Sequence, residues 1–194
     1  MNNVFKQPFP IIDIDDKYRL REQQVSDTAS FLAYYSDPAV SHFILADIPS
    51  TLSGAEYEIR YCRTLFYRQQ GLYWAIAEKS TDAMIGAIGL YLTNPPEAEI
   101  CYDLHKGYWQ RGLMTRCMIK AMRFIFSHHI NDQLIAITIK ENHASVALLL
   151  KLGFHHHETR KQDRHFQGKL HDTEIYLITK ASFLKQFPDD TITA

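Results

Sequence analysis

The stretch AEICYDLHKGYWQRGLMT, residues 98–115, decides the fold because it joins a strand, a loop and the start of a helix. Its first half is strand-like, and apolar residues recur at helical spacing after Gly112. A helix that starts directly after such a loop presents unpaired N–H groups and the positive end of its dipole. Because residues 106–116 contain no Asp or Glu, the sequence predicts an anion-binding site here, with Lys106 and Arg111 adding positive charge. The alternative, which one glycine leaves open, is that Gly112 only eases a tight loop.

The segments around this stretch predict a mixed α/β sheet with one parallel crossover in its middle. The runs before and after the turn compositions STD and NPPE form an antiparallel meander. The apolar run 134–140 predicts a strand buried on both faces, which favours parallel pairing beside a helix. Ser26 or Asp27 would cap the first helix, and Ser53 with Glu56 forms a capping box at the second. The predicted strands are 17–24, 72–79, 83–93, 98–105, 134–140, 154–166 and 169–180, and the predicted helices span 26–37, 53–70, 112–127, 142–152 and 182–187.

Size and composition fit a single compact domain that needs no disulfide. The chain has 194 residues and a formal net charge of −1, so a nucleic-acid partner is disfavoured. Cys62, Cys101 and Cys117 are widely spaced, which fits reduced thiols buried as small apolar side chains. The N-terminal residues lack a signal-peptide pattern, and no run approaches the roughly 18 apolar residues of a membrane span. We therefore expect a soluble, cytoplasmic protein that binds neither nucleic acid nor membranes.

Two motifs together resemble a known family. The stretch 98–115, followed later by NHASVALLLKLGF (142–154), resembles the paired acyl-CoA motifs of the GNAT N-acetyltransferase superfamily. Within it the likeness is to the ribosomal-protein N-terminal acetyltransferases, the RimJ/RimL-like branch, and it extends over residues 17–180. It implies one GNAT domain over residues 1–194 with a motif region at 98–154, and a mostly antiparallel sheet of about six to seven strands with helices on both faces. The matching positions are Tyr102, Tyr108, Trp109, Arg111, Gly112, Thr115, Asn142, Ser145, Gly153 and Phe154.

The resemblance also implies where acetyl-CoA binds as a co-substrate, without a metal. The N–H groups of the loop and the first helical turn would hold the pyrophosphate, which agrees with the anion site derived from the loop. The pantetheine arm would bond to the strand before the loop like an added strand. The implied cofactor-binding residues are Tyr102, Asp103, Leu104, Gln110, Arg111, Gly112, Leu113, Met114, Thr115, Asn142 and Ser145.

The chain departs from the family pattern at a few positions. Cys101 replaces a glycine that is usual in the branch, Arg116 replaces a common acidic residue, and Met114 replaces a small residue of many superfamily members. Leu149 occupies the position where other GNAT enzymes present the tyrosine thought to protonate the leaving thiolate. The tyrosine mechanism is therefore not expected here.

Two residues are the predicted catalytic groups. Ser145 is the predicted proton donor to the thiolate, directly or through water, although a serine near a helix start often only caps that helix. Glu99 is the predicted base for the acceptor amine, because its place on the strand resembles that of a base in many GNAT enzymes. The alternative for Glu99 is an ordinary solvent-facing strand residue. Weaker candidates for the base, which the sequence does not rank, are Asp103, Glu158 and Glu174.

The predicted function is transfer of an acetyl group from acetyl-CoA to a primary amine, by direct attack in a ternary complex. The acceptor is a protein N-terminus, as the branch implies, or a small amine, and the protein is a monomer or a homodimer. One alternative is a non-catalytic acyl-CoA-binding module, which Leu149 supports. Another is a zinc-dependent hydrolase, because His155 and His157 alternate onto one strand face and His165 and His171 can lie across the hairpin. No second cluster of residues has the spacing of zinc ligands. These histidines are therefore expected to form a wall of the acceptor groove or to lie on the plain surface.

Overall fold

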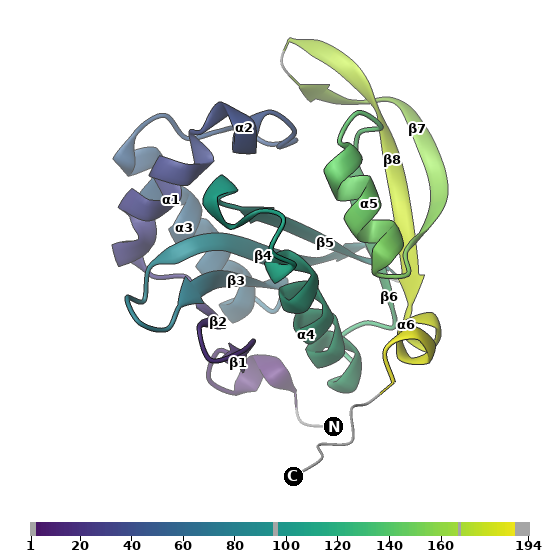
Figure 1. Ribbon diagram of the computed structural model, residues 1–194, viewed down its shortest axis with the longest axis horizontal. Helices are drawn as coiled ribbons and strands as arrows, with labels where there is room; N and C mark the ends of the chain where they lie inside the picture. The colour runs from purple at the N-terminus through teal and green to yellow at the C-terminus, as the bar shows by residue number, and fades with distance from the viewer. Residues whose placement is uncertain (1–2, 95–96, 167, 189–194) are drawn as a thin grey trace.

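The computed structural model describes residues 3–94, 97–166 and 168–188. Within them eight strands form one sheet in the order β1-β2-β3-β4-β5-β6-β8-β7 (Figure 1). Neighbouring strands in the described ranges are antiparallel except β5 and β6, which are parallel and are joined through α4. The strands are β1 (Ile12–Asp13), β2 (Tyr18–Glu22), β3 (Gly71–Glu78), β4 (Met84–Asn94), β5 (Glu97–Leu104), β6 (Gln133–Thr138), β7 (His155–Phe166) and β8 (Lys169–Thr179).

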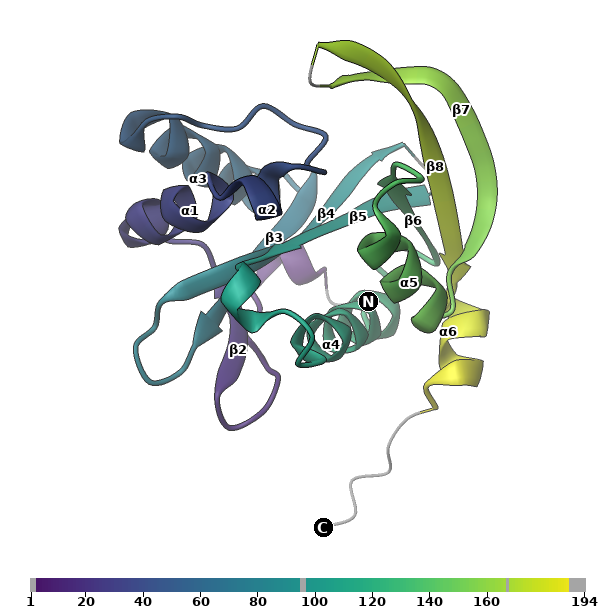
Figure 2. The same cartoon turned by 45° about the horizontal axis from the view of Figure 1, so that its top comes forward.

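Helices cover both faces of this sheet (Figure 2). One face carries α1 and α3, and the opposite face carries α4 and α5. No helix in the described ranges is both long and apolar enough to cross a bilayer. The helices are α1 (Thr28–Tyr35), α2 (Pro38–Ser41), α3 (Leu52–Tyr67), α4 (Leu113–Ser127), α5 (His143–Lys151) and α6 (Lys180–Gln186), with 3-10 turns η1 (Val4–Lys6), η2 (Val25–Asp27) and η3 (Lys106–Tyr108).

The core follows from the alternation of side chains along the central strands. Trp74 and Ile88 are fully buried on the face that packs against α4, where they share one cluster with Met122. Ala75 is on the other face and shares a cluster with Ile59 of α3. Large apolar side chains therefore fill the α4 side, and small ones let α3 lie close to the sheet.

The feature that positions the site is the divergence of β5 and β6. On one side β5 pairs with β4 as far as Leu104. On the other side β6 pairs with β5 only at Ala98 and Glu99, and the two strands then separate (Figure 2). The second half of β5 therefore has a sheet edge exposed between β5 and β6.

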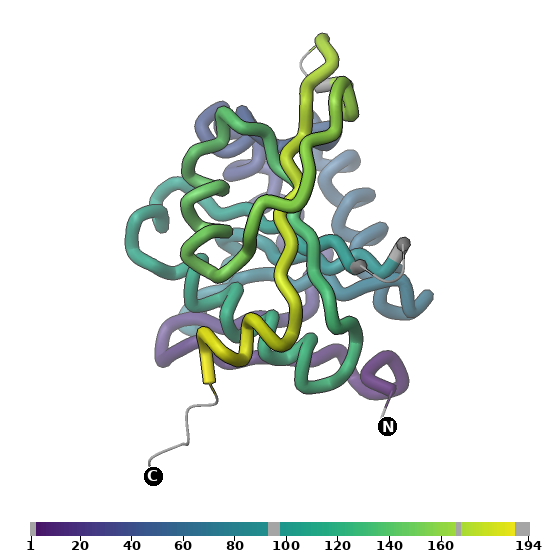
Figure 3. Tube along the Cα trace, turned by 90° about the vertical axis from the view of Figure 1, so that its right-hand side faces the viewer, coloured from purple at the N-terminus to yellow at the C-terminus, as the bar shows by residue number. Residues whose placement is uncertain are grey.

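A long hairpin of β7 and β8 extends past the rest of the sheet (Figure 3). The register of β7 shifts twice, between His156 and Glu158 and between Arg160 and Arg164. At the second shift Gln162 has a positive φ of 49°, and its N–H donates to the Asp172 carboxylate at 3.0 Å. These bulges interrupt the simple alternation that the sequence suggested for this arm.

The structure confirms the seven predicted strands, the meander and the parallel crossover. The eighth strand, β1, has two residues and pairs with β2 at the edge of the sheet. So short a strand carries no periodic pattern, which is why the sequence does not reveal it.

One predicted helix cap is wrong, and another is correct in position but makes no side-chain bond to its helix. The cap of α3 is Thr51, whose Oγ1 accepts the N–H of Gly54 at 3.1 Å, so Ser53 lies inside the first turn. Asp27 is at the cap position of α1, as predicted, but its carboxylate makes no cap bond to that helix. The carboxylate accepts hydrogen bonds of 2.7 and 2.8 Å from Arg21, with both side chains 5% exposed, and one of 2.8 Å from the N–H of Gln24 in the preceding 3-10 turn. Its oxygens are therefore used by the strand residue and the turn rather than by α1.

The three cysteines are free thiols. Cys62 and Cys117 are buried, as predicted, and burial raises the pKa of the Cys117 thiol to about 12. Cys101 is partly buried, and its Sγ lies 3.2 Å from the hydroxyl of Tyr73. It stands where the resemblance implies a glycine, and its side chain lies next to Tyr73 of β3.

Candidate functional site

The loop between β5 and α4 is held by its two aromatic residues. The indole Nε1 of Trp109 donates to the C=O of Leu104 at 2.7 Å, and the hydroxyl of Tyr108 donates to Glu78 at 2.9 Å. Lys106, expected to add charge near the helix start, is instead paired with Asp37 at 2.6 Å. The Tyr-Trp pair thus fixes the loop, and Lys106 neutralises the cap of α2.

The start of α4 lacks a cap of its own. Side-chain oxygens of Asp37, Thr51, Asn142 and Thr179 accept first-turn N–H groups of α2, α3, α5 and α6. In α4 the cap position is Gly112, and no described side chain bonds there. The first intrahelical bond at this end runs from the N–H of residue 116 to the C=O of residue 112. The N–H groups of residues 113–115 therefore have no helical acceptor, which leaves them for an anion.

Glycine is required at position 112 because of the backbone conformation there, and not because a side chain would lack space. Its φ of +67° lies in the left-handed region, and Gln110 just before it has a φ of +59°. A Cβ built at Gly112 would meet only Arg116 Nη1, at 3.6 Å, which is ordinary contact. These two left-handed residues turn the chain into α4 so that the first N–H groups of the helix point outward from its start.

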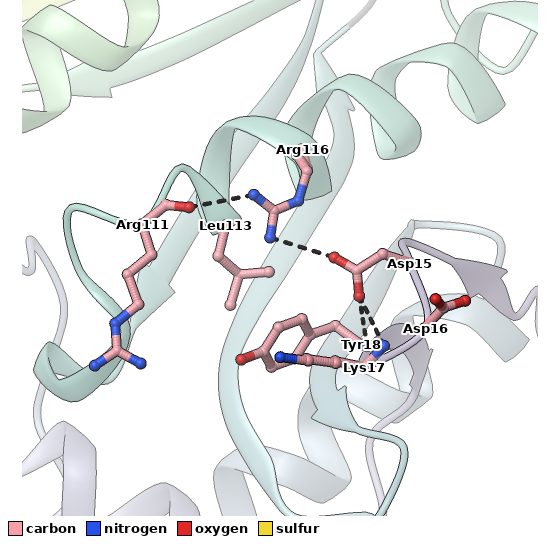
Figure 4. A pocket seen from close by; sticks show the side chains of 7 residues that line it. All are labelled: Asp15, Asp16, Lys17, Tyr18, Arg111, Leu113 and Arg116. Carbon is pink, nitrogen blue, oxygen red and sulfur yellow. Dashed lines mark hydrogen bonds and ion pairs between the residues drawn. The ribbon is translucent and has the colours of Figure 1, made fainter.

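A pocket of about 400 Å³ lies beside this helix start (Figure 4). Arg116 connects its two walls, because it donates to the C=O of Arg111 at 3.2 Å and pairs with Asp15 at 3.2 Å. Burial acts to raise the pKa of Asp15, but N–H groups of Lys17 and Tyr18 and the Arg116 guanidinium outweigh it and lower that pKa. The Asp15 carboxylate is therefore already bound by its own partners, and none of its described bonds goes to the amides of α4.

The exposed edge of β5 presents backbone groups in a defined order. In an antiparallel pair, every second residue bonds to the partner strand. The N–H of His105 donates to Ile85 of β4 at 2.8 Å, so the backbone groups of Asp103 also face β4. Those of Tyr102 and Leu104 face the opposite edge, where β6 has already separated. Since Leu104 C=O accepts from Trp109, the Tyr102 N–H and C=O and the Leu104 N–H remain for an extended ligand.

Tyr102 and Ser145 meet on the α5 side of the sheet. Their hydroxyl oxygens are 2.8 Å apart, and the N–H of Ser145 donates to Asn142 Oδ1 at 3.1 Å. Burial raises the pKa of Tyr102, and the hydrogen bond with Ser145 acts against this. Leu149 is fully buried in the core. A tyrosine hydroxyl thus reaches the site from β5 instead of α5, and the alternation of β5 was the signal that could have shown it.

The predicted base lies on the opposite face. Alternation along β5 places Glu99 and Asp103 on the side of α1 and α3. Burial raises the pKa of Glu99, while the charges of Arg164 and Arg160 act to lower it. The Asp103 carboxylate accepts a hydrogen bond of 2.7 Å from Tyr34 of α1. The structure therefore separates the candidate residues into an α4–α5 group and an α1–α3 group, with β5 between them.

The remaining predicted cofactor contacts divide between backbone and side chain. Leu113 is 2% exposed in the core, so it can offer only its N–H group, while Met114 is partly buried and packs against that core. Arg111 and Gln110 are exposed, and the Arg111 guanidinium lies 5.9 Å from the Tyr108 ring centre. Thr115 is half-buried in the first turn.

The histidine-rich arm does not gather ligands. A bulge at His157 breaks its alternation with His155, and His156 is paired with Glu174, which also accepts from Thr159. Glu158 is paired with Arg160 at 2.7 Å. In the described parts of the chain, no three His, Cys, Asp or Glu side chains lie together as metal ligands would. Glu158 and Glu174 are thus both engaged in pairs on the hairpin.

Known proteins resemble this chain in sequence and in fold. The uncharacterized N-acetyltransferase YoaA of Bacillus subtilis (strain 168) is 27% identical over 174 residues, which cover 89% of this chain and 98% of YoaA. RimL, a ribosomal L7/L12 alpha-N-protein acetyltransferase solved in complex with coenzyme A, superimposes with a TM-score of 0.79 at 18% identity, covering 88% of this chain and 98% of RimL. The microcin C7 self-immunity acetyltransferase MccE, in complex with acetyl-CoA and AMP, gives 0.76 at 16%, covering 91% and 99%.

At identities of 18% and 16%, RimL and MccE show that this chain shares their fold. The model of the acetyltransferase (GNAT) domain matches residues 17–155, well over half of the chain. The matched range includes the β5 edge, the start of α4 and the α5 residues described above. The protein therefore belongs to the GNAT acetyltransferase family.

Proposed function

We propose that the protein transfers the acetyl group of acetyl-CoA to a primary amine, either the N-terminus of a protein or a small amine. The observation that carries the proposal is the uncapped start of α4 beside the exposed edge of β5. Amides at a helix start suit a diphosphate, and a strand edge suits the two amides of pantetheine. Both features of the site therefore fit one molecule, coenzyme A.

The first task of the site is to hold this cofactor. The N–H groups of residues 112–115 would bind the diphosphate, with the exposed Arg111 adding charge. The Tyr102 C=O and the Leu104 N–H would bond to the pantetheine arm as a neighbouring strand does. Asn142 keeps its oxygen on the α5 cap, so we propose that it orders Ser145 and contacts the cofactor with its remaining NH₂ group.

The second task is to stabilise charge as the thioester reacts. An attacking amine drives negative charge onto the carbonyl oxygen of the thioester. The N–H of Tyr102 faces the exposed edge and would donate to that oxygen, a contribution of about 3 kcal/mol for a preorganised donor. The bond from carbon to sulfur then breaks, and the thiolate needs a proton.

The pair of Tyr102 and Ser145 would supply that proton. Their hydroxyls are already hydrogen-bonded, so Ser145 can donate to the thiolate while Tyr102 donates to Ser145. Glu99 is the base that the sequence predicts, and burial raises its pKa as a base for neutral pH requires. A second carboxylate, that of Asp103, lies on the same face of β5.

Relatives support the proposal without settling the acceptor. YoaA is named an N-acetyltransferase, RimL acts on a ribosomal protein and was solved with coenzyme A, and MccE was solved with acetyl-CoA. The two solved structures share the cofactor class that the site fits, and RimL is named by the ribosomal protein that it modifies. Both N-terminal peptides and small amines are therefore tested as acceptors of this chain.

The test is thiol release from acetyl-CoA across a panel of N-terminal peptides and small amines. We expect turnover with at least one amine, and a fall in kcat of about tenfold or more in Ser145→Ala with unchanged acetyl-CoA affinity. Ser127→Ala is the matched control, because Ser127 lies at the far end of α4 and bonds only within that end. Acetyl-CoA at a hundred times its Kd should also stabilise the fold by about 2.7 kcal/mol.

Two outcomes would contradict the proposal. Absence of thermal stabilisation by millimolar acetyl-CoA would remove the cofactor assignment. Stabilisation without thiol release from any amine would replace the enzyme with a non-catalytic acyl-CoA-binding module.

A further inference from the structure

A carboxylate that the binding of acetyl-CoA does not use lies beneath α1. Asp103 is partly buried on the α1–α3 face of β5, and the Tyr34 hydroxyl donates to its Oδ1 at 2.7 Å. Tyr34 is itself 2% exposed, so this bond is protected from water. It ties α1 to the strand that carries the exposed edge, which fixes both the helix and the direction of the carboxylate.

The surroundings of Asp103 contain acids and neutral groups but no paired cation. Tyr35 projects from α1 and Glu58 and Cys62 from α3, while the ring of His105 lies 6.3 Å from that of Tyr34. The strands add Tyr73 from β3, Tyr91 from β4 and Cys101 from β5. Among the described residues no Lys or Arg forms an ion pair with Asp103. Burial therefore raises its pKa to about 7, with the Tyr34 hydrogen bond acting against the rise.

Position along β5 separates Asp103 from Glu99. Asp103 directly follows Tyr102, whose N–H faces the edge proposed for the thioester. Glu99 is three residues before Tyr102, about 10 Å along a strand that rises by about 3.3 Å per residue. Arg160 and Arg164 also act on Glu99 and favour its charged form, which weakens it as a base. Its shorter distance along β5 from Tyr102 and the charges around it both favour Asp103 over Glu99 as the base.

A small pocket next to Asp103 gives its proton a way out. The pocket has a volume of about 20 Å³, room for about one water, and polar groups of Gln23, Tyr35, Glu58 and Asp103 are among its lining. Glu58 is half-buried on α3, and burial raises its pKa. A water in this pocket would link Asp103 to Glu58 and from there to solvent.

We infer that Asp103 is the base that takes the proton of the acceptor amine, and that Tyr34 is the residue that positions its carboxylate. The inference rests on the proposed function and replaces Glu99 in that role. The ammonium of the acceptor gives one proton to Asp103, and the neutral nitrogen attacks the thioester carbon. As the carbon–sulfur bond breaks, the attacking nitrogen gives its second proton to water, the thiolate takes a proton from the Ser145 side, and an amide and a thiol leave. Asp103 then releases its proton through the pocket, while solvent restores Ser145 and Tyr102.

The test is the pH dependence of kcat/KM for Asp103→Asn, Tyr34→Phe and Glu99→Gln, with Asp132→Asn as an exposed control. The acceptor should be an amine with a pKa near 10, so that its own titration stays outside the window from pH 5.5 to 8.5. Wild type and Asp132→Asn should lose activity as the pH falls through about 7, because the base must be deprotonated. In Asp103→Asn, kcat/KM should fall by about 10²-fold or more and should no longer depend on pH in this way. The acetyl-CoA affinity and the melting temperature of this variant show whether it is folded.

Tyr34→Phe gives the result that a purely structural role would not. Loss of a donor to the carboxylate raises the pKa of Asp103, so the acid limb should move to higher pH. Glu99→Gln should keep the limb at the wild-type pH. An unchanged limb in Tyr34→Phe, or a limb lost in Glu99→Gln and kept in Asp103→Asn, would overturn the inference while thiol release by wild type still upheld the proposed function.

Discussion

Replacing Gly112 with alanine separates the backbone conformation at the start of α4 from steric effects. The φ of +67° is one that alanine adopts at a cost of about 1–2 kcal/mol. The nearest atom to the new Cβ would be Arg116 Nη1 at 3.6 Å, so no clash adds to this cost. For a domain of this size, 1 kcal/mol lowers the melting temperature by about 2–4 °C. Gly112→Ala should therefore melt about 2–8 °C below wild type.

Gly168→Ala is the matched control. Gly168 also has a positive φ, of +78°, with nothing within 4 Å of a built Cβ, and it lies in the hairpin far along the chain from α4. Both variants should lose similar stability. Only Gly112→Ala should relieve its strain by turning the first amides of α4, and we expect its acetyl-CoA affinity to fall by about tenfold, or 1.4 kcal/mol.

Calorimetric titration with acetyl-CoA and thermal melting of both variants decide the matter. Equal affinity of the two variants would refute the claim that the α4 amides bind the diphosphate. A loss of stability well above about 3 kcal/mol in Gly112→Ala alone would refute the argument that conformation, and not crowding, requires glycine there.

Three further predictions concern the hydroxyl pair of Tyr102 and Ser145, the buried ion pair of Arg21 and Asp27, and the carboxylate of Asp103. Tyr102→Phe removes the hydroxyl bonded to Ser145 and should lower kcat as Ser145→Ala does, with no further loss in the double variant; additive losses in a double-mutant cycle would contradict this. Asp27→Asn leaves the Arg21 charge partly unpaired in the interior and should cost about 2–4 kcal/mol in urea unfolding; a cost below about 1 kcal/mol would contradict the buried pair. Asp103 has a raised pKa of about 7 against 3.8, so between these values the folded protein holds a proton that the unfolded chain has lost, and its contribution to stability falls as the pH rises. The melting temperature of Asp103→Asn relative to wild type should therefore rise from pH 5 to pH 8, and a constant difference would show that the pKa is not raised.

The sequence predicted those parts of the site that depend on local chain geometry. The strand, the Tyr-Trp loop and the uncapped helix at Gly112 follow one another directly, so composition and spacing reveal them. The motif at Asn142 and Ser145 is equally local, since the asparagine caps the helix whose first turn contains the serine. The resemblance to the GNAT family rests on these two local segments.

The rest depends on register and on partners distant in sequence. The bond between Tyr34 and Asp103 joins residues 69 positions apart, and that between Tyr102 and Ser145 joins residues 43 apart. The pairing of Lys106 with the cap of α2 likewise required the packing of α2 against the loop. Such contacts follow from how helices lie on the sheet, which no local pattern specifies.

The most direct test of the central claim is a crystal structure of the protein with coenzyme A. The account predicts the diphosphate within hydrogen-bonding distance of the N–H groups of residues 112–115, and the pantetheine arm bonded to Tyr102 and Leu104. A ligand seated elsewhere, such as in the pocket lined by Asp15 and Arg116, would contradict it. So would a carboxylate of the chain bound to those helix amides in its place.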